Sequence, residues 1–233
     1  MKRKCIIFLM ALIVGAVIFG NTPKRQMANQ EMPKVEGWFF RSVSGYPVSI
    51  VFEPIALFKN GDYFEVGEEP LEELDIEVSK IKKPEAWGRW NLTNGTYFLT
   101  NSKGKTHGYK LGEGNWFPAF GYEDTFKLKQ QYERTSGGDY GNGTQSLAIS
   151  KIRFLDDNLF TEGLNTGIAT PNAAAWKKSE HAGTYKIKGH TLILHYTNGK
   201  EIHRSFAIGA SGRPPKPTTN MIFIGGDAFI DNE

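Results

Sequence analysis

The chain has 233 residues, with 28 Lys and Arg against 25 Asp and Glu, 26 Gly, 11 Pro and a single Cys. A hydrophobic share of 39% excludes an intrinsically disordered protein, and a net charge of +3 argues against a nucleic-acid-binding chain. One cysteine can form neither an internal disulfide nor a thiolate zinc site. An apolar core must therefore stabilise the fold, and the length suffices for one large domain or two small ones.

The N-terminus has the layout of a secretory signal peptide. Lys2, Arg3 and Lys4 form a basic stretch, and residues 5–20 are an apolar run of 16 residues that ends at a polar segment. A transmembrane helix needs about 20 apolar residues. We therefore expect residues 1–20 to be a cleaved signal peptide, with an uncleaved membrane anchor as the alternative.

Cleavage would also change the charge of the chain. It removes three basic residues and no acidic one, which leaves 25 of each. Nothing in the mature chain then favours nucleic acid or an anionic membrane. We expect an exported protein, periplasmic or secreted, that touches a membrane only through an uncleaved N-terminal segment.

After a polar linker over residues 21–36, residues 37–233 have the pattern of short strands separated by turns. Three Asn-Gly pairs flanked by aromatic or β-branched residues predict hairpins. These pairs are Asn60-Gly61, Asn94-Gly95 and Asn198-Gly199. The pattern predicts a single all-β domain, an antiparallel meander barrel or sandwich.

Two longer segments interrupt the strand pattern. In residues 71–83, Leu71, Leu74, Val78 and Ile81 recur at helical spacing before Pro84, which predicts one short helix. Residues 161–182 are rich in Gly, Asn and Ala, and we expect them to form a loop.

An internal duplication is indicated by matches at a spacing of about 95 residues. The matches keep their order along the chain, so we expect two repeats, at about 38–111 and 132–208, followed by a closing strand or hairpin in residues 221–230. The matched pairs are Arg41 with Arg134, Phe58 with Phe154, Phe64 with Phe160, Gly88 with Gly183, Trp90 with Tyr185, Leu99 with Leu194, and Gly104 with Gly199.

The hairpin in residues 183–208 allows its register to be predicted. A three-residue loop that ends at a left-handed Gly199 pairs Leu194 with Ile202 and gathers the apolar side chains on one face. The opposite face then carries His195, Glu201 and His203. Two histidines and a carboxylate can bind zinc, but we expect a solvated strand face and predict neither a metal nor a cofactor.

The sequence lacks a Gly-x-Ser-x-Gly elbow, a phosphate-binding loop and a His-Glu-x-x-His motif. We therefore do not expect an enzyme, although an unfamiliar active site stays open. Trp87, Trp116 and Trp176 lie in or beside expected loops. They are the candidate ligand-binding residues, as an aromatic lid over a pocket beneath the two interrupting segments.

Gly88-Arg89-Trp90, which recurs as Gly183-Thr184-Tyr185, resembles the Gly-x-Trp opening strand of lipocalin-like barrels. The resemblance covers about 25 residues per repeat, and a second lipocalin motif is absent. It implies that Trp90 and Tyr185 are structural residues that plug a barrel. The chain is also similar to duplicated secreted bacterial all-β proteins of uncharacterised function, with meanders like that of residues 183–200.

These features predict an exported, non-enzymatic β protein that binds a small apolar or glycan ligand. The alternative is an envelope structural or protein-interaction module without a ligand pocket. A cavity of about 300 Å³ or more lined by aromatic residues favours the first class, and an exposed apolar patch over a filled core favours the second. Convergent titratable groups in that cavity would instead indicate an enzyme.

Overall fold

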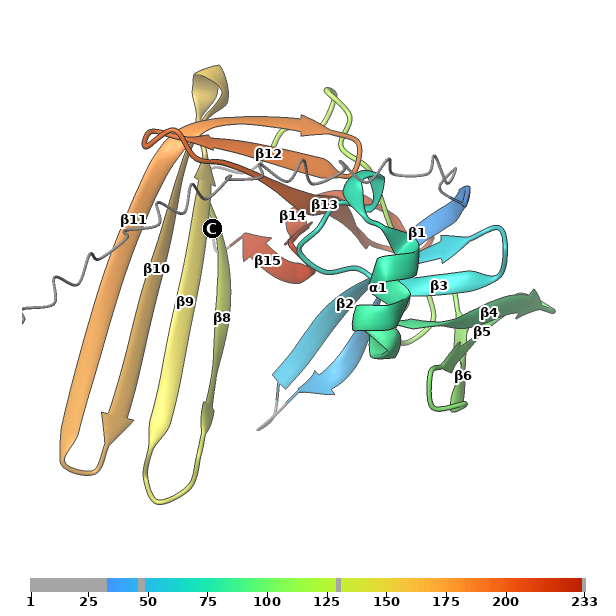
Figure 1. The fold of residues 1–233 in the computed structure, drawn as a ribbon, viewed down its shortest axis with the longest axis horizontal. Helices are drawn as coiled ribbons and strands as arrows, with labels where there is room; N and C mark the ends of the chain where they lie inside the picture. Colours follow the sequence, from blue (N-terminus) through green and yellow to red (C-terminus); the bar gives the residue numbers. More distant parts are fainter. Residues whose placement is uncertain (1–32, 46–48, 129–130, 232–233) are drawn as a thin grey trace, which may run out of the picture. The chain divides into compact units, whose positions relative to one another are not determined.

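The computed structural model describes residues 33–45, 49–128 and 131–231, which belong to one compact unit. The expected signal peptide and nearly all of the expected linker lie outside these residues. The described chain is all-β and antiparallel, as predicted, and consists of two sheets (Figure 1).

Seven strands form an open sheet in the order β6-β5-β4-β3-β2-β1-β7. They are β1 (Val35–Gly45), β2 (Ser49–Phe58), β3 (Asp62–Glu65), β4 (Trp87–Thr93), β5 (Thr96–Asn101), β6 (Thr106–Lys110) and β7 (Trp116–Ala119). Five consecutive antiparallel pairings join β1 to β6, and β7 returns to pair with β1.

Eight strands form a closed barrel in which each strand pairs with the next along the chain. They are β8 (Gln131–Asp139), β9 (Gln145–Phe154), β10 (Leu159–Thr170), β11 (Ala173–Lys188), β12 (Thr191–Tyr196), β13 (Glu201–Ser211), β14 (Lys216–Ile224) and β15 (Asp227–Asp231). The C-terminal hairpin β14–β15 closes the barrel on β8.

The segment between β3 and β4 contains the one α-helix of the described residues, as predicted. Helix α1 (Ile76–Lys82) begins after Asp75, whose carboxylate accepts a hydrogen bond of 3.0 Å from Val78 N–H. The 3₁₀ helices η1 (Leu71–Glu73) and η2 (Pro84–Ala86) flank it, and η3 (Asp156–Asn158) joins β9 to β10.

The expectation of a loop over residues 161–182 is wrong. Strands β10 and β11 continue through this segment and turn at residues 171–172, so that β8 to β11 form two long hairpins side by side (Figure 1). Gly, Asn and Ala are poor strand formers by propensity, but pairing on both sides of β10 overrides that preference.

The predicted register of the β12–β13 hairpin is confirmed. Leu194 pairs with Ile202, and Gly199 has φ +84°. The hairpin predicted at Asn94-Gly95 is also present, because both residues have positive φ in the turn between β4 and β5. Asn and Gly tolerate this left-handed backbone, which explains why these pairs mark the turns.

Pairing registers in the two sheets correspond strand by strand. Trp90 pairs with Leu99 between β4 and β5, and Tyr185 pairs with Leu194 between β11 and β12. Leu99 likewise pairs with His107, as Leu194 pairs with Ile202. The meander β4–β6 therefore has the same register as β11–β13 at a constant spacing of 95 residues.

The strands before this meander match at a different spacing. Ile55 pairs with Glu65, and Ile152 pairs with Glu162, 97 residues later in each case. The expected match of Phe58 with Phe154, at a spacing of 96, is therefore off by one residue. A one-residue shift moves a side chain to the other face of a sheet, and Phe58 and Phe154 indeed lie in different core clusters.

The glycine of each Gly-x-(Trp/Tyr) motif is required by the facing strand. A Cβ on Gly183 would overlap the carbonyl oxygen of His195, and a Cβ on Gly88 would overlap that of Thr100. His195 and Thr100 are themselves 95 residues apart. Both motifs therefore mark one structural position, where the facing backbone leaves no room for a side chain.

We expect Gly183→Ala and Gly88→Ala each to lower the free energy of unfolding by about 1–3 kcal/mol, as overpacking does in a filled core. The control is Gly163→Ala on β10, where the nearest atom to an added Cβ lies 3.7 Å away and the change should stay within about 0.5 kcal/mol. Urea unfolding measures all three. Equal effects at the three positions would contradict the steric explanation.

The buried apolar residues form three clusters. The first fills the barrel and includes Phe160, Leu194 and Phe206. The second is shared by both sheets, since Phe40 of β1 packs with Phe223 of β14, ring centroids 5.0 Å apart. The third lies on the other face of the seven-stranded sheet.

Candidate functional site

A hollow of about 200 Å³ borders the barrel core where the core side chains give way to charged ones. The pairing of strands β8 to β11 places their side chains in successive rows on the inner face of the barrel. The apolar row is Phe154, Phe160 and Gly183; the next is Tyr132, Ile152, Glu162 and His181; the third is Arg134, Ser150, Leu164 and Ser179. The hollow is lined by the second and third rows, with side chains from β13 and β15 opposite.

Two arginines and three carboxylates meet around the hollow. Arg204 Nη1 donates to Glu162 at 3.3 Å, and Arg204 Nε lies 3.5 Å from a Glu68 oxygen. Arg134 pairs with Asp227 at 2.9 Å. Arg204 Nε is buried and makes no hydrogen bond within the described part of the chain.

Further contacts fix the orientation of these groups. Tyr196 donates its hydroxyl hydrogen to Glu162 at 2.6 Å. Burial and this hydrogen bond to Glu162 raise the pKa of Tyr196, so the phenol stays a donor at neutral pH. Burial also raises the pKa of Asp227, although the positive charges of Arg134 and Arg204 oppose that rise.

Glu68 comes from the segment between β3 and η1, outside the barrel strands. Its backbone carbonyl accepts a hydrogen bond of 2.8 Å from Ser205 N–H, and the Ser205 hydroxyl donates to the carbonyl of Gly67 at 2.5 Å. The Glu68 carboxylate lies against Gly225, where a Cβ would approach it to 2.6 Å. The segment between β3 and η1 therefore supplies one wall of the hollow in the barrel.

A wider groove of about 650 Å³ lies mainly on the outer face of the same strands. Its lining includes Lys151, Arg153, Asn165 and Lys178. Lys151 pairs with Glu133, and Lys178 pairs with Glu180 at 2.6 Å, so most of this basic charge is compensated. The inner hollow, with its buried donor, is the better-defined candidate site.

The three tryptophans predicted as an aromatic lid are not brought together, and none of them lines either hollow. Trp87 and Trp116 begin strands β4 and β7 and are buried in two different core clusters. These two positions lie beside loops, as expected, whereas the expected loop position of Trp176 is wrong. Trp176 lies within β11, 63% exposed, with its ring over Gly167.

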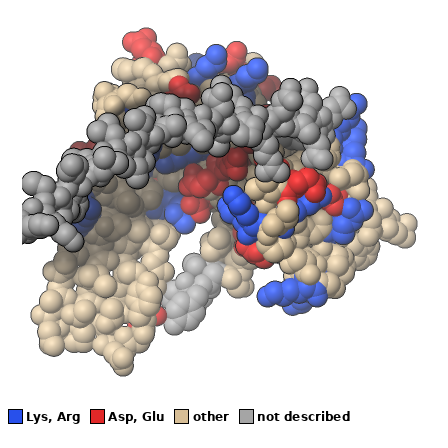
Figure 2. All heavy atoms as spheres, in the orientation of Figure 1, with Lys and Arg blue, Asp and Glu red and all other residues tan. Residues whose placement is uncertain are grey.

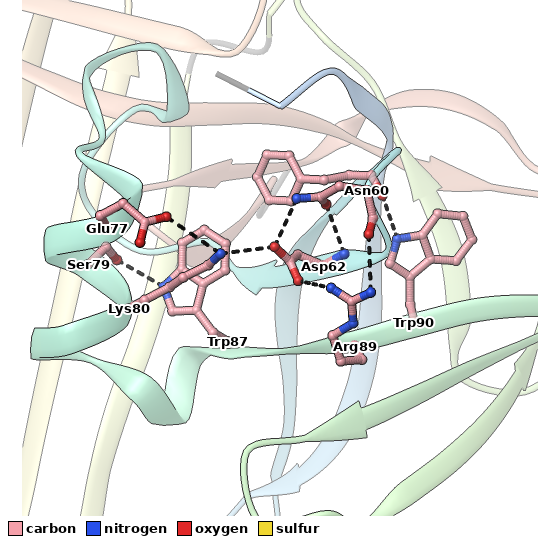
Figure 3. Close-up of polar contacts among 9 residues, drawn as sticks. Asn60, Asp62, Glu77, Ser79, Lys80, Trp87, Arg89 and Trp90 are labelled. Atoms are coloured by element: carbon pink, nitrogen blue, oxygen red, sulfur yellow. Dashed lines mark hydrogen bonds and ion pairs between the residues drawn. The ribbon is translucent and has the colours of Figure 1, made fainter. Parts of the chain in front are cut away.

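Trp87 belongs to a polar network that ties helix α1 to the sheet (Figure 3). Its Nε1 donates to Ser79 at 3.0 Å, while Lys80 and Arg89 pair with Asp62 at 3.0 and 2.5 Å. Burial alone would raise the pKa of Asp62, but Lys80 and Arg89 lower it on balance. Asp62 also pairs with Asn60, so its oxygens are satisfied and the network is structural.

The face that carries His195, Glu201 and His203 is bonded within itself. Glu201 lies 2.7 Å from His195 Nδ1 and 2.8 Å from His203 Nε2, and Glu73 of η1 pairs with the other ring nitrogen of His203. The described residues contain no group of three or more His, Cys, Asp or Glu arranged to hold a metal ion.

Glu73 and Glu201 together raise the pKa of His203. A folded-state pKa above the unfolded value gives stability that is present below the unfolded pKa and is lost as pH rises through the folded pKa. We expect Glu73→Gln to move the His203 pKa back toward the ordinary range, measured by NMR titration of the ring protons. An unchanged pKa would contradict the contact with Glu73.

Sequence reasoning missed every charged residue of the inner hollow. Arg134 was noticed only as a repeat marker, and Glu68, Glu162, Arg204 and Asp227 carried no local signal. Of these residues, only Arg204 could have been placed on the inner face from the sequence. The confirmed β12–β13 register puts it on the apolar face with Leu192.

No family model, no curated protein and no solved structure matches this chain. The described residues include no helix long and apolar enough to cross a membrane.

Proposed function

We propose that this chain is an exported, non-enzymatic β protein that binds a small polar ligand in the inner hollow of its barrel. The observation that carries the proposal is the hollow itself, which is lined by the charged side chains of Arg134, Arg204, Glu162 and Asp227. Buried charged groups are costly unless paired, and sites for polar ligands keep such groups.

The sequence predicted a small apolar molecule or a glycan as the ligand, and the charged lining favours the glycan. Carboxylates, guanidinium groups and the hydroxyls of Ser150 and Ser179 offer hydrogen bonds in both directions. A volume of about 200 Å³ is below the usual range for drug-sized ligands, so the ligand is small.

The absence of catalysis is part of the proposal. The rim carries Ser179 and His181, yet no hydrogen bond joins them among the described residues. An activated nucleophile needs a base within hydrogen-bond reach. The ion pairs around Arg204 and Arg134 instead resemble a recognition surface, in which charges are held for binding.

We also propose that the two sheets descend from a duplicated unit related to lipocalin-like barrels. Support comes from the matching registers, from the shared motif glycines and from an inward-facing arginine in the first strand of each repeat, Arg41 and Arg134. In the first repeat, Arg41 is held by Glu53 and Glu65 at 2.8 and 2.7 Å. That arginine is paired with two carboxylates, whereas Arg134 borders the hollow of the barrel.

Untargeted mass spectrometry of small molecules that co-purify with the exported protein tests the binding proposal. We expect a small polar molecule to accompany the wild-type protein and to be lost from Arg204→Met. Glu113→Gln, on an exposed ion pair with Lys110 in the other sheet, is the matched control and should retain it. Identical profiles for the two variants would contradict the site.

Export is tested by sequencing the N-terminus of the native protein. We expect a start after residue 20 in a periplasmic or secreted fraction, because the basic stretch and apolar run precede it. An intact Met1 in a cytosolic fraction would overturn this part of the proposal.

A protein-interaction module is the second candidate, and the long hairpins favour it. Residues 140–150 and 163–176 contain no Asp, Glu, Lys or Arg, and the hairpin ends are almost free of charge in Figure 2. Leu164, Ile168 and Trp176 are exposed there. Exposed apolar side chains in such a run suit a protein partner.

The edge of β11 shows how a partner could attach. Thr197 N–H donates to Ala182 O, so the backbone groups of Ala182 point away from β10, and those of Lys178 and Glu180 do the same by alternation. Within the described chain, this part of β11 has no strand on that side, and an extended peptide can add one.

Lys178→Pro tests this second candidate. Proline removes a backbone donor from the free edge without breaking the ladder with β10. A photo-crosslinker near the edge should capture an envelope protein in the wild type and in Lys178→Ala, and lose it in Lys178→Pro. Crosslinking that is equal in all three would contradict strand addition.

A further inference from the structure

The groups that face the inner hollow do not balance in charge. Glu68, Glu162 and Asp227 are acidic, and only Arg134 and Arg204 oppose them. Lys151 also borders the hollow, but its register places it with Glu133 and Gly163 on the outer face, where Glu133 pairs with it. With histidine counted as neutral at pH 7, the hollow carries one uncompensated negative charge.

The hydrogen bonds around Arg204 are also incomplete. A single guanidinium serves both Glu162 and Glu68, at 3.3 and 3.5 Å, and the longer contact leaves Nε without a hydrogen bond among the described residues. A buried donor without an acceptor costs free energy. Arg204 therefore neutralises the two carboxylates incompletely, which agrees with the charge count of the hollow.

The chemistry of Asp227 agrees with the charge count. Burial raises its pKa even though Arg134 and Arg204 are close enough to oppose the rise. An additional cation beside this carboxylate would favour its ionised form. The carboxylate is thus ready to accept a charged donor from a ligand.

We propose that the hollow recognises a small hydroxylated amine, with an amino sugar as the model compound. The ammonium would pair with the carboxylates of Asp227 and Glu68, and the ligand hydroxyls would form hydrogen bonds with Ser150 and Ser179 of the lining. The inference rests on the proposed ligand-binding function and narrows its ligand class. An acidic sugar fits poorly, since its carboxylate would add a second uncompensated negative charge.

Three sugars that share one ring but differ in charge separate these classes. D-glucosamine, D-glucose and D-glucuronate are titrated into the exported protein at pH 7 and low ionic strength, followed by NMR chemical shifts or calorimetry. We expect glucosamine to bind about tenfold or more tightly than glucose, and glucuronate to bind weakest. Added salt should reduce the difference, because ions screen a charge-based preference.

Two variants test the charge count directly. Glu68→Gln changes a carboxylate whose side chain is 72% exposed, and it should fold normally. It should bring the ratio of glucosamine to glucose affinity toward one, and Asp227→Asn should do the same if its thermal melt is normal. Glu113→Gln should leave the ratio unchanged.

The outcomes separate this inference from the function on which it rests. If glucose binds as tightly as glucosamine, or glucuronate binds best, the amine preference is wrong and ligand binding stands. If no sugar binds while mass spectrometry finds another co-purifying molecule that Arg204→Met loses, the amine class is wrong but the site is right. If no sugar binds and no molecule co-purifies, both the amine preference and the ligand-binding function are contradicted.

Discussion

Replacing Trp116 with alanine is expected to lower the free energy of unfolding by about 3–5 kcal/mol, the range for truncating a buried tryptophan. Trp116 is fully buried, with 0% exposure, and its ring stacks on Phe39 and Tyr109 at centroid distances of 4.9 and 5.1 Å. It begins β7, which pairs with β1 through Arg41. Its loss leaves a cavity where the third core cluster meets an edge strand.

Chemical unfolding of Trp116→Ala and of Trp176→Ala gives the comparison. Trp176 is 63% exposed, so the same truncation there should cost less than about 1 kcal/mol. Trp116→Phe should cost less than Trp116→Ala, because it keeps a ring and removes an indole N–H that is buried without a hydrogen bond in the described structure. Equal losses at Trp116 and Trp176 would mean that the aromatic cluster contributes little.

The parts of the fold that could be predicted are those with local causes. Asn94, Gly95 and Gly199 need positive φ, and that requirement fixes the turns and through them the pairing of Leu194 with Ile202. The short helix was also predicted from a single segment, but α1 begins only at Ile76, so Leu71 and Leu74 lie outside it, and Ile81 is 80% exposed. Register then determines which side chains share a face.

The parts that could not be predicted depend on distant chain segments. Trp116 looks like a loop residue until β1 pairs with it, and residues 161–182 look like a loop until β9 and β10 pair. The inner hollow is the extreme case, because Glu68, Glu162, Arg204 and Asp227 lie on four different elements. Only closure of the barrel and the contact of Ser205 with residues 67–68 bring them together.

Arg41→Met should destabilise the protein by about 3 kcal/mol at neutral pH, the lower end of the range for breaking a buried ion pair. The Arg41 side chain is only 14% exposed and serves Glu53, Glu65 and the hydroxyl of Tyr109. The side chains of Glu53 and Glu65 are 36% and 34% exposed. Solvent therefore screens their charges, and we expect a loss of stability at the lower end of that range. The variant leaves two carboxylates facing each other without a cation.

The pH dependence identifies the cause. Burial already raises the pKa of Glu65, with Arg41 opposing the rise, so loss of Arg41 should raise it further. When the pKa of a carboxyl is higher in the folded state than in the unfolded state, its contribution to stability is present below the unfolded pKa. That contribution is lost as pH rises through the folded pKa. The difference in free energy of unfolding between Arg41→Met and wild type, measured with urea, should therefore decrease as pH is lowered from 7 to 5.

A double-mutant cycle with Glu65→Gln completes the test. Adding Glu65→Gln to Arg41→Met should recover part of the lost stability, because it removes one of the two facing charges, whereas Glu65→Gln alone should destabilise. The exposed pair of Lys110 and Glu113, 4.0 Å apart, is the control, and Lys110→Met should cost less than about 1 kcal/mol at either pH. If the loss in Arg41→Met is independent of pH and of Glu65, then Arg41 stabilises the seven-stranded sheet through the packing of its aliphatic stem and not through its charge.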